Sequence, residues 1–304
     1  MDLKQLQYFV ACAQTGSVSE AAKILYSTQP SVSKVVKALE DSLGMQLFER
    51  LPRGIRLTPQ GSQVYHYACK IVSEVTKLEA VAEHGMTKWL RISANPSSWF
   101  ATQFVDFYNE NYDKNYHFQV YTAGVRTVME RVRDYQDDVG FVYILERQKE
   151  EFLYELSRNR MEFIPLQDTE AIVYPGRNSS LYGIKKDSLS FEELDGVRLV
   201  QNYQDEFFDI GASGNSESFS LKSLDASVIT NSDYIMERLL KNSDVVNISG
   251  SYLSENKKDT IPGIPLKMKG SRVIFGYIRH RGEEPDSSLR EFIHFLEERI
   301  GSDK

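Results

Sequence analysis

The sequence has few cysteines and no long apolar run, which excludes several classes of protein. Cys12 and Cys69 are the only two cysteines among 304 residues, so one chain can form neither a disulfide framework nor a four-thiolate zinc site. The five histidines show no metal-ligand spacing. No apolar run reaches the roughly 18 residues that a membrane span needs, and the N-terminus does not read as a leader peptide. We therefore expect a cytoplasmic protein with no structural metal and no membrane partner.

Short catalytic motifs are missing as well. The chain contains no G-x-S-x-G elbow, no Walker loop and no G-x-G-x-x-G fingerprint. An enzyme that converts a metabolite is a second hypothesis for residues 89–304, and a solute-binding protein for transport is a third. Because no catalytic motif supports the enzyme, we expect no catalytic residue and no cofactor. The missing leader peptide, together with the DNA-binding pattern of the N-terminal region described below, argues against the transport protein.

Negative charge dominates the chain but is unevenly distributed. The net charge is −7, yet residues 1–88 hold ten lysines and arginines against eight acidic residues. Within residues 23–56 the balance is six basic against three acidic residues. Phosphate attraction is screened within about 10 Å, so binding depends on local charge. A basic face on an acidic protein is therefore compatible with DNA binding.

Residues 1–44 have the apolar periodicity of three short helices. The first is expected to end near Thr15 and Gly16. Ser17 and Glu20 then form a capping-box pattern, in which the Ser17 hydroxyl accepts from a helical N–H and the Glu20 side chain reaches back. The third helix opens just before Pro30, since proline is tolerated in a first turn.

This third helix is predicted to have two unlike faces. The inner face carries Val32, Val35, Val36, Leu39 and Leu43. The opposite face carries Gln29, Pro30, Ser33, Lys34 and Lys37. That face is polar and cationic and can donate to base edges, while the helix N-terminus adds partial positive charge.

Two short apolar pieces follow, residues 47–48 and 55–57, on either side of Pro52, Arg53 and Gly54. This pattern predicts a β-hairpin, or wing. Three amphipathic helices and a hairpin could equally form a small interaction domain with a solvated basic face, and periodicity alone leaves both interpretations open.

Many ordered positions of this region match a known family. Residues 16–25, 29–33, 39–40, 43–44, 47–50 and 57–61 closely resemble the N-terminal signature of LysR-type transcriptional regulators. The resemblance implies a winged helix-turn-helix over residues 1–57 that binds an interrupted palindromic site on double-stranded DNA. It implies base reading by Gln29, Pro30, Ser33 and Lys34, backbone contacts from Ser17 and Thr28, and a wing contact by Arg53. It also implies a homodimer or homotetramer that works with RNA polymerase.

Residues 58–88 are predicted to form a long linker helix, with Thr58 as its N-cap and Pro59 at its first position. Its apolar positions alternate in steps of four and three, as a two-helix seam requires. The seam would comprise Val64, Ala68, Ile71, Val75, Leu78 and Ala82. In LysR-type proteins this helix links and dimerises the chains; packing on the adjacent domain is the alternative.

Residues 89–304 alternate predicted strands and helices, which indicates an α/β domain with a parallel sheet. We expect two Rossmann-like lobes, residues 89–161 with 268–304 and residues 162–267. A similar effector domain, itself like periplasmic binding proteins, occurs in LysR-type proteins and holds a small-molecule effector between its lobes. Molybdate-responsive regulators share a similar DNA-binding domain, but this second part disfavours them. The chain departs from many members at residues 240–247, with glycine only at Gly250.

Ligands gather beyond the carboxyl ends of parallel strands. The effector candidates on this rule are Asn95, Ser97, Ser98, Thr122, Gly124, Gln201, Asn202, Thr230 and Asn231. Serine, threonine and asparagine are also favoured in helix caps and turns, so a purely local role is the alternative for each. No compact arginine group marks an anion site, and the effector is left unidentified.

Overall fold

The computed structural model describes residues 1–84, 88–112, 114, 116–202, 226–250, 261–267, 270 and 272–302. The chain divides into two compact units. Unit 1 comprises Met1–Thr87 together with Asp134–Gln136, and unit 2 comprises Lys88–Arg133 and Asp137–Lys304. Among the helices in these described ranges, none has the length and apolar character needed to cross a membrane.

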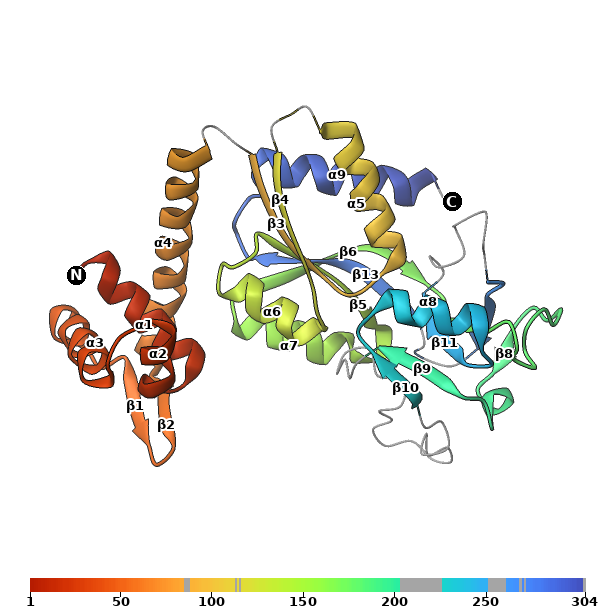
Figure 1. The fold of residues 1–304 in the computed structure, drawn as a ribbon, viewed down its shortest axis with the longest axis horizontal. Coiled ribbons are helices and arrows are strands. Elements are labelled where there is room, and N and C mark those ends of the chain that lie inside the picture. The colour runs from red at the N-terminus through yellow and green to blue at the C-terminus, as the bar shows by residue number, and fades with distance from the viewer. Residues whose placement is uncertain are drawn as a thin grey trace. The chain divides into compact units, whose positions relative to one another are not determined.

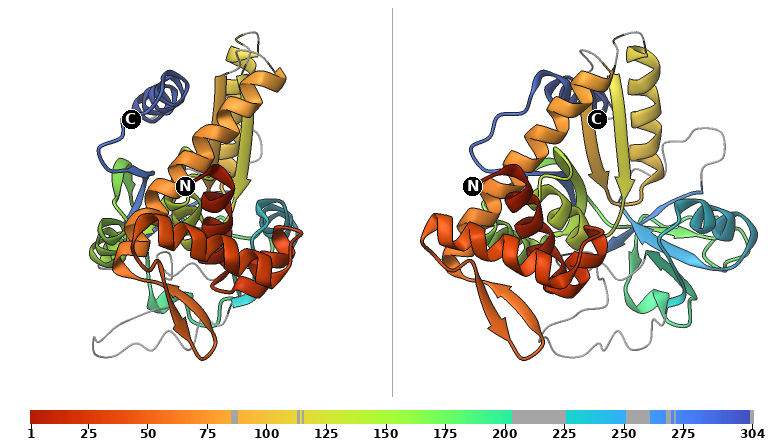
Figure 2. Two further views of the ribbon diagram at one scale, coloured as in Figure 1. Left: turned by 90° about the vertical axis from the view of Figure 1, so that its left-hand side faces the viewer. Right: turned by 60° about the vertical axis from the view of Figure 1, so that its left-hand side comes forward.

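Unit 1 contains the predicted helices and hairpin. The helices are α1 (Leu3–Thr15), α2 (Val18–Ile24), α3 (Gln29–Leu43) and the long α4 (Pro59–His84). Strands β1 (Phe48–Leu51) and β2 (Gly54–Leu57) pair antiparallel, and this hairpin, the wing, extends away from α1, α2 and α3 in Figures 1 and 2. The family resemblance and the periodicity therefore predicted these elements correctly.

Helix α2 begins differently from the prediction in one detail. The Ser17 hydroxyl accepts from the Glu20 N–H at 3.3 Å, as the capping box requires. The Glu20 carboxylate, however, pairs with Lys23 Nζ at 2.7 Å. The Ser17 N–H that it was expected to bind donates instead to Thr15 Oγ1 at 3.3 Å. The predicted return bond is wrong because Thr15 satisfies the same N–H first.

Two apolar clusters hold unit 1 together. One joins α1, α3, the wing and α4 through Leu6, Phe9, Val10, Leu39, Leu47, Tyr65, Ala68 and Cys69. The other joins α1, α2 and α3 through Ala11, Cys12, Ala21, Ala22, Val32 and Val36. Both cysteines are buried and unbridged, and burial raises the pKa of the Cys12 thiol to about 11. A thiol held neutral in this way is a packing group rather than a nucleophile.

Unit 2 contains a five-stranded sheet in the order β4-β3-β5-β13-β6. Its strands are β3 (Lys88–Ala94), β4 (Tyr116–Thr122), β5 (Val139–Leu145), β6 (Met161–Thr169) and β13 (Val273–His280). Strand β3 runs parallel to β4 and β5, whereas β13 runs antiparallel to β5 and β6. The late strand thus returns to the first lobe as predicted.

The predicted lobe boundary at residue 162 is too early. Strand β6 pairs with β13 from Met161 to Thr169 and therefore belongs to the first sheet over its whole length. Sequence alternation alone cannot place this strand, because its partner lies more than 100 residues later in the chain. The lobe boundary falls after residue 169 instead.

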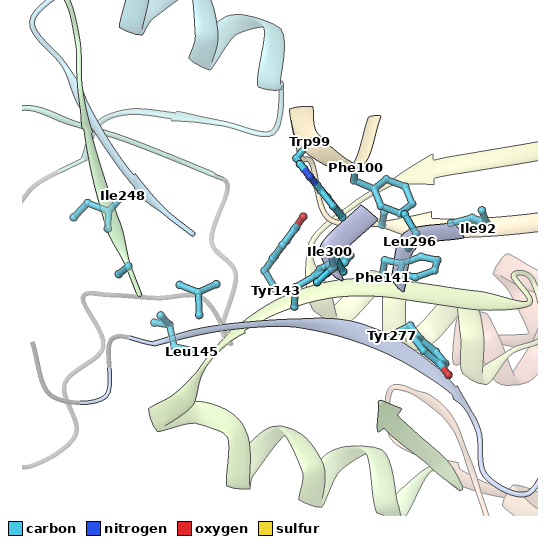
Figure 3. Packing of buried hydrophobic residues seen from close by; sticks show 14 of the residues in the cluster. Ile92, Trp99, Phe100, Phe141, Tyr143, Leu145, Ile248, Tyr277, Leu296 and Ile300 are labelled. Carbon is cyan, nitrogen blue, oxygen red and sulfur yellow. The ribbon is translucent and has the colours of Figure 1, made fainter. Parts of the chain in front are cut away.

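Helices cover both faces of this sheet. Helices α5 (Ser98–Asn111) and α9 (Ser287–Ser302) pack on one face, and α6 (Val125–Arg133) and α7 (Lys149–Arg158) on the other (Figure 1). Helix α7 was not predicted. Figure 3 shows Trp99 and Phe100 of α5 on the same side of the strands as Leu296 and Ile300 of α9. The ring of Phe141 on β5 lies 5.1 Å from that of Phe100.

The second sheet of unit 2 has six strands in the order β10-β9-β11-β7-β12-β8. These are β7 (Ile172–Pro175), β8 (Leu189–Ser190), β9 (Leu199–Asn202), β10 (Ala226–Thr230), β11 (Val246–Ser249) and β12 (Ile264–Lys267). Helix α8 (Asp233–Asn242) and two short 3-10 turns, Glu146–Gln148 and Glu192–Leu194, complete the unit. Strands β9, β10 and β11 run parallel, so their carboxyl ends lie at one edge.

Candidate nucleic-acid interface and ligand site

Helix α3 presents the two faces that its sequence predicts. Val32, Val36 and Leu39 are buried, while Val35 and Leu43 are half-buried. On the opposite face Gln29, Pro30, Lys34 and Lys37 are exposed and Ser33 is half-buried. The structure thus brings the predicted base-reading residues together on one accessible, cationic surface.

The N-termini of α2 and α3 are capped by the two residues predicted to contact the DNA backbone. Thr28 Oγ1 accepts from the Ser31 N–H at 3.4 Å, and Ser17 does the same for Glu20. A hydroxyl that accepts in this way keeps its own O–H free to donate. Both caps can therefore donate to a phosphate oxygen where the helix dipole also favours an anion.

The wing is held against the turn between α1 and α2. The Ile55 N–H donates to the Gly16 carbonyl at 2.9 Å. Gly54 has a φ of 97°, and a Cβ there would overlap the Gly16 carbonyl oxygen, so only glycine fits. Arg53 lies exposed at the tip between the paired residues Leu51 and Gly54. Its guanidinium is consequently presented on a fixed support.

Glu40 connects α3 to the wing, a role that sequence reasoning missed. Its Oε1 accepts from the Leu47 N–H at 2.8 Å and from the Phe48 N–H at 3.2 Å. The Leu47 carbonyl in turn accepts from the Thr58 N–H at 2.9 Å, where α4 begins. A Cβ at Gly61 would overlap that same carbonyl oxygen, which explains the glycine. Helices α3 and α4 and the wing thus meet at Leu47.

The predicted seam of α4 is only partly exposed on the surface of the helix. Ala68 is only 1% exposed and packs inside its own unit, so it is not available to a second chain, and Val64 is half-buried beside the same cluster. Ile71 and Leu78 are 42% and 68% exposed, Ala82 is exposed and Val75 is half-buried. Tyr67 and Val81, which were not predicted, are exposed near Ile71 and Leu78 on the helical repeat. We call Tyr67, Ile71, Leu78 and Val81 the α4 stripe.

In unit 2, several ligand candidates serve local structure. The Asn95 amide donates to the Ala123 carbonyl at 2.9 Å and accepts from the Tyr143 N–H at 2.9 Å, so both of its ends bind the protein. Ser97 caps α5 and lies 3.0 Å from the Tyr143 hydroxyl. Thr230 Oγ1 accepts from the Ser232 N–H at 3.1 Å. The local alternative therefore accounts for these contacts of Asn95, Ser97 and Thr230.

The remaining ligand candidates are more accessible to solvent. Thr122, Gly124 and Asn231 are exposed, and Gln201 is half-buried. The Gly124 carbonyl accepts from the Val128 N–H as α6 begins. The side chain of Asn202 lies outside the described residues.

A contact between Ser98 and Asp233 connects the candidate residues that follow β3 of the first sheet with those that follow β10 of the second. Ser98 Oγ, in the first turn of α5 after β3, lies 3.5 Å from Asp233 Oδ2. Asp233 is the first residue of α8, two residues after Asn231 and three after Thr230. Burial raises the pKa of Asp233 to about 6, and the hydrogen bond from Ser98 opposes this shift. Sequence reasoning missed Asp233, because an acid in a first helical turn reads as an ordinary dipole partner.

Comparison with known proteins agrees with this geometry. The model for "Bacterial regulatory helix-turn-helix protein, lysR family" matches residues 3–62. The HTH-type transcriptional regulator BenM of Acinetobacter baylyi is 31% identical over 145 residues, which are 46% of this chain and 47% of BenM. The RuBisCO operon transcriptional regulator of Allochromatium vinosum is 35% identical over 116 residues, 37% of this chain and 38% of that protein. These alignments span about half or less of the relatives' length.

Solved structures resemble the chain along its length. A full-length OxyR variant from Pseudomonas aeruginosa matches with a TM-score of 0.55 at 18% identity, covering 99% of this chain and 97% of that one. A hydrogen-peroxide-bound OxyR mutant from Corynebacterium glutamicum matches with a TM-score of 0.51 at 18% identity, covering 99% and 93%. At such identity the likeness shows the fold: a helix-turn-helix unit followed by a two-lobed α/β unit.

Proposed function

We propose that this chain, whose residues 3–62 belong to the lysR family of bacterial regulatory helix-turn-helix proteins, regulates transcription by binding double-stranded DNA. Its relatives are named as transcriptional regulators, and we assign no catalytic step to the chain. DNA binding of this kind places the protein in the cytoplasm with the chromosome.

The observation that carries this proposal is the exposed face of α3. Gln29, Ser33 and Lys34 are accessible at the N-terminal half of a helix whose other face is fully used in the core. Amide, hydroxyl and ammonium groups are the ones that read base edges in the major groove. Lys37 adds local charge for the phosphates, and Arg53 on the wing reaches the backbone beside the groove.

A dimer is proposed from the α4 stripe. Large apolar side chains on one face of a long helix are costly in water, and a second copy of the helix can bury them. Two copies related by a twofold axis would present two α3 helices, so the site on DNA would be an interrupted palindrome. A homotetramer would bind two such sites, with RNA polymerase recruited or blocked nearby.

Unit 2 is proposed to bind a small-molecule effector. The support is the contact between Ser98 and Asp233, which brings the carboxyl end of β3 next to the segment that follows β10. Ser98, Thr122, Gly124, Gln201 and Asn231 remain the proposed ligand contacts, with Asn95, Ser97 and Thr230 in supporting positions. A ligand that alters the spacing of the two sheets would change how a dimer holds its two α3 helices.

The test is a selection followed by a titration. Wild-type protein selects duplexes from a random-sequence pool, and the enriched duplex is compared with an unrelated one in a mobility shift across a salt series. The proposal requires tighter binding of the enriched duplex and affinity that falls steeply with salt. A pool that shows no enrichment would overturn it. Repeating the titration with candidate metabolites tests the effector.

A further inference from the structure

The end of α2 carries a tyrosine where the ends of α1 and α3 carry glycine. Gly16 and Gly44 follow α1 and α3 with φ values of 62° and 66°. Tyr26 follows α2 with a φ of 48°. This left-handed conformation suits glycine, because a Cβ there crowds the following carbonyl.

The backbone of Tyr26 is fixed by hydrogen bonds and not by its side chain. The Tyr26 N–H donates to the Lys23 carbonyl at 3.2 Å, and the Ser27 N–H donates to the Ala22 carbonyl at 2.9 Å. These two bonds form a Schellman motif, whose left-handed position is usually glycine. Glycine would close α2 equally well, so this turn does not itself require a tyrosine.

The ring makes the choice of tyrosine more unusual. Tyr26 is 99% exposed, so within the described part of the chain its ring gains almost no packing. Tyr26 therefore has an unfavourable left-handed backbone conformation and also exposes its aromatic ring to water. A local conformation that is unfavourable and fully exposed points to a contact made outside the chain.

The position of Tyr26 indicates which contact this is. Thr28, which caps α3, lies two residues later, and the exposed Gln29 lies three residues later. Tyr26 thus stands at the edge of the surface proposed to face DNA. A tyrosine hydroxyl is among the groups that bind phosphate oxygens, and the ring can pack on the adjoining sugar.

We propose that Tyr26 is a positioning residue for DNA binding, with its ring on a deoxyribose and its hydroxyl donating to a phosphate beside each half-site. The inference rests on the proposed function of unit 1. Such a contact fixes the angle at which α3 enters the groove but carries no sequence information. It also neutralises no phosphate charge, because the phenol is neutral.

The test compares Tyr26→Gly and Tyr26→Phe with wild type in full-length protein. The probes are the duplex enriched by wild type and an unrelated duplex, each titrated by fluorescence anisotropy across a salt series. Tyr26→Gly should weaken binding to both duplexes about tenfold, with the slope of log affinity against log salt unchanged. Tyr26→Phe, which keeps the ring, should lose less.

Stability measurements separate this role from a structural one. Tyr26→Gly removes the left-handed cost and should raise the melting temperature by about 2–4 °C even though binding weakens. The matched variant Gly44→Tyr places a tyrosine in the left-handed conformation at the end of α3, where a Cβ meets nothing within 4 Å. This variant should lower the melting temperature. Tyr154→Ala removes another exposed ring, 64% accessible in unit 2, where the Arg158 guanidinium lies over it, and should leave the affinity for both duplexes unchanged.

Each other outcome overturns the inference. Wild-type affinity in Tyr26→Gly would show that the ring does not touch DNA and belongs to another partner. A loss confined to the enriched duplex would make Tyr26 a base-reading residue. A lower melting temperature would make it a structural one. In all three cases the enrichment and salt dependence of wild type still test the proposed function separately.

Discussion

Glu40 on α3 and Leu47 at the foot of the wing are joined by a 2.8 Å hydrogen bond from the Leu47 N–H to the Glu40 carboxylate. The same oxygen accepts from Phe48, so one side chain satisfies two successive backbone donors before β1 begins. This bond fixes the distance between the proposed base-reading helix and the proposed backbone-binding wing. We therefore expect Glu40 to influence the proposed DNA binding through the position of the wing.

Glu40→Ala should destabilise unit 1 by about 1–3 kcal/mol, because the Leu47 and Phe48 N–H groups lose their acceptor in a half-buried position. Glu40→Gln keeps an oxygen at the same place and should cost less. Urea unfolding of both variants measures the difference. Equal stability of Glu40→Ala and wild type would mean that water replaces the carboxylate without loss.

Lys34→Ala combined with Gln29→Ala should abolish discrimination between the enriched duplex and random DNA while the fold stays intact. Both side chains are exposed on the outer face of α3, and each base contact is worth about 1–3 kcal/mol. Footprinting and anisotropy provide the measurement. Lys4→Ala, exposed on α1, is the matched loss of charge and should keep the preference. An unchanged footprint in the double variant would contradict the assignment.

Arg53→Ala should weaken binding to all sequences alike, because an exposed cation at the wing tip binds phosphates and not one base pair. The slope of log affinity against log salt should fall by roughly one unit. Titrations on both duplexes at four salt concentrations measure it. If the loss were confined to a single base position, Arg53 would be reading sequence instead.

Ile71→Asp should separate the proposed dimer. The side chain lies at the centre of the α4 stripe, and a carboxylate there would face its own symmetry mate at a cost of several kcal/mol. Sedimentation should report a single chain near 34.9 kDa with a native circular dichroism spectrum, and DNA affinity should fall by orders of magnitude. Thr76→Asp places the same charge on the opposite side of α4 and should remain dimeric. A dimeric Ile71→Asp would locate the interface elsewhere.

Asp233 should make the stability of unit 2 fall as pH rises from about 4 to about 6. Its pKa is raised by burial from 3.8 to about 6 in the folded chain, so in this window the unfolded carboxyl loses its proton and the folded one keeps it. Above pH 6 the loss in the free energy of unfolding that ionised Asp233 causes is constant and at most about 3 kcal/mol. Asp233→Asn should flatten the profile and stabilise the unit at pH 7, as urea unfolding would show. The exposed Asp187→Asn serves as control, and parallel profiles for Asp233→Asn and wild type would contradict the shift.

Sequence reasoning was strongest where the contacts are local. The two faces of α3, the caps Thr28 and Thr58, and the hairpin around Arg53 follow from periodicity and turn chemistry over a few residues. It failed where a role depends on a remote partner. The Glu40 carboxylate accepts from backbone N–H groups seven and eight residues away, and Asp233 meets Ser98 at a separation of 135 residues.

By itself the sequence determined that unit 1 would have a winged helix-turn-helix, because its signature residues are the caps, glycines and core positions that such a fold needs. Tertiary structure alone decided which apolar residues of α4 stay outside, since Ala68 has the same helical spacing as Ile71 but packs on α1. Only the tertiary structure also shows that β6 belongs to the first sheet and that the Tyr26 side chain is exposed to solvent. Burial and strand pairing depend on which residues lie next to a side chain in space. A periodic pattern predicts that one face will be buried, but it does not identify the residues that cover that face.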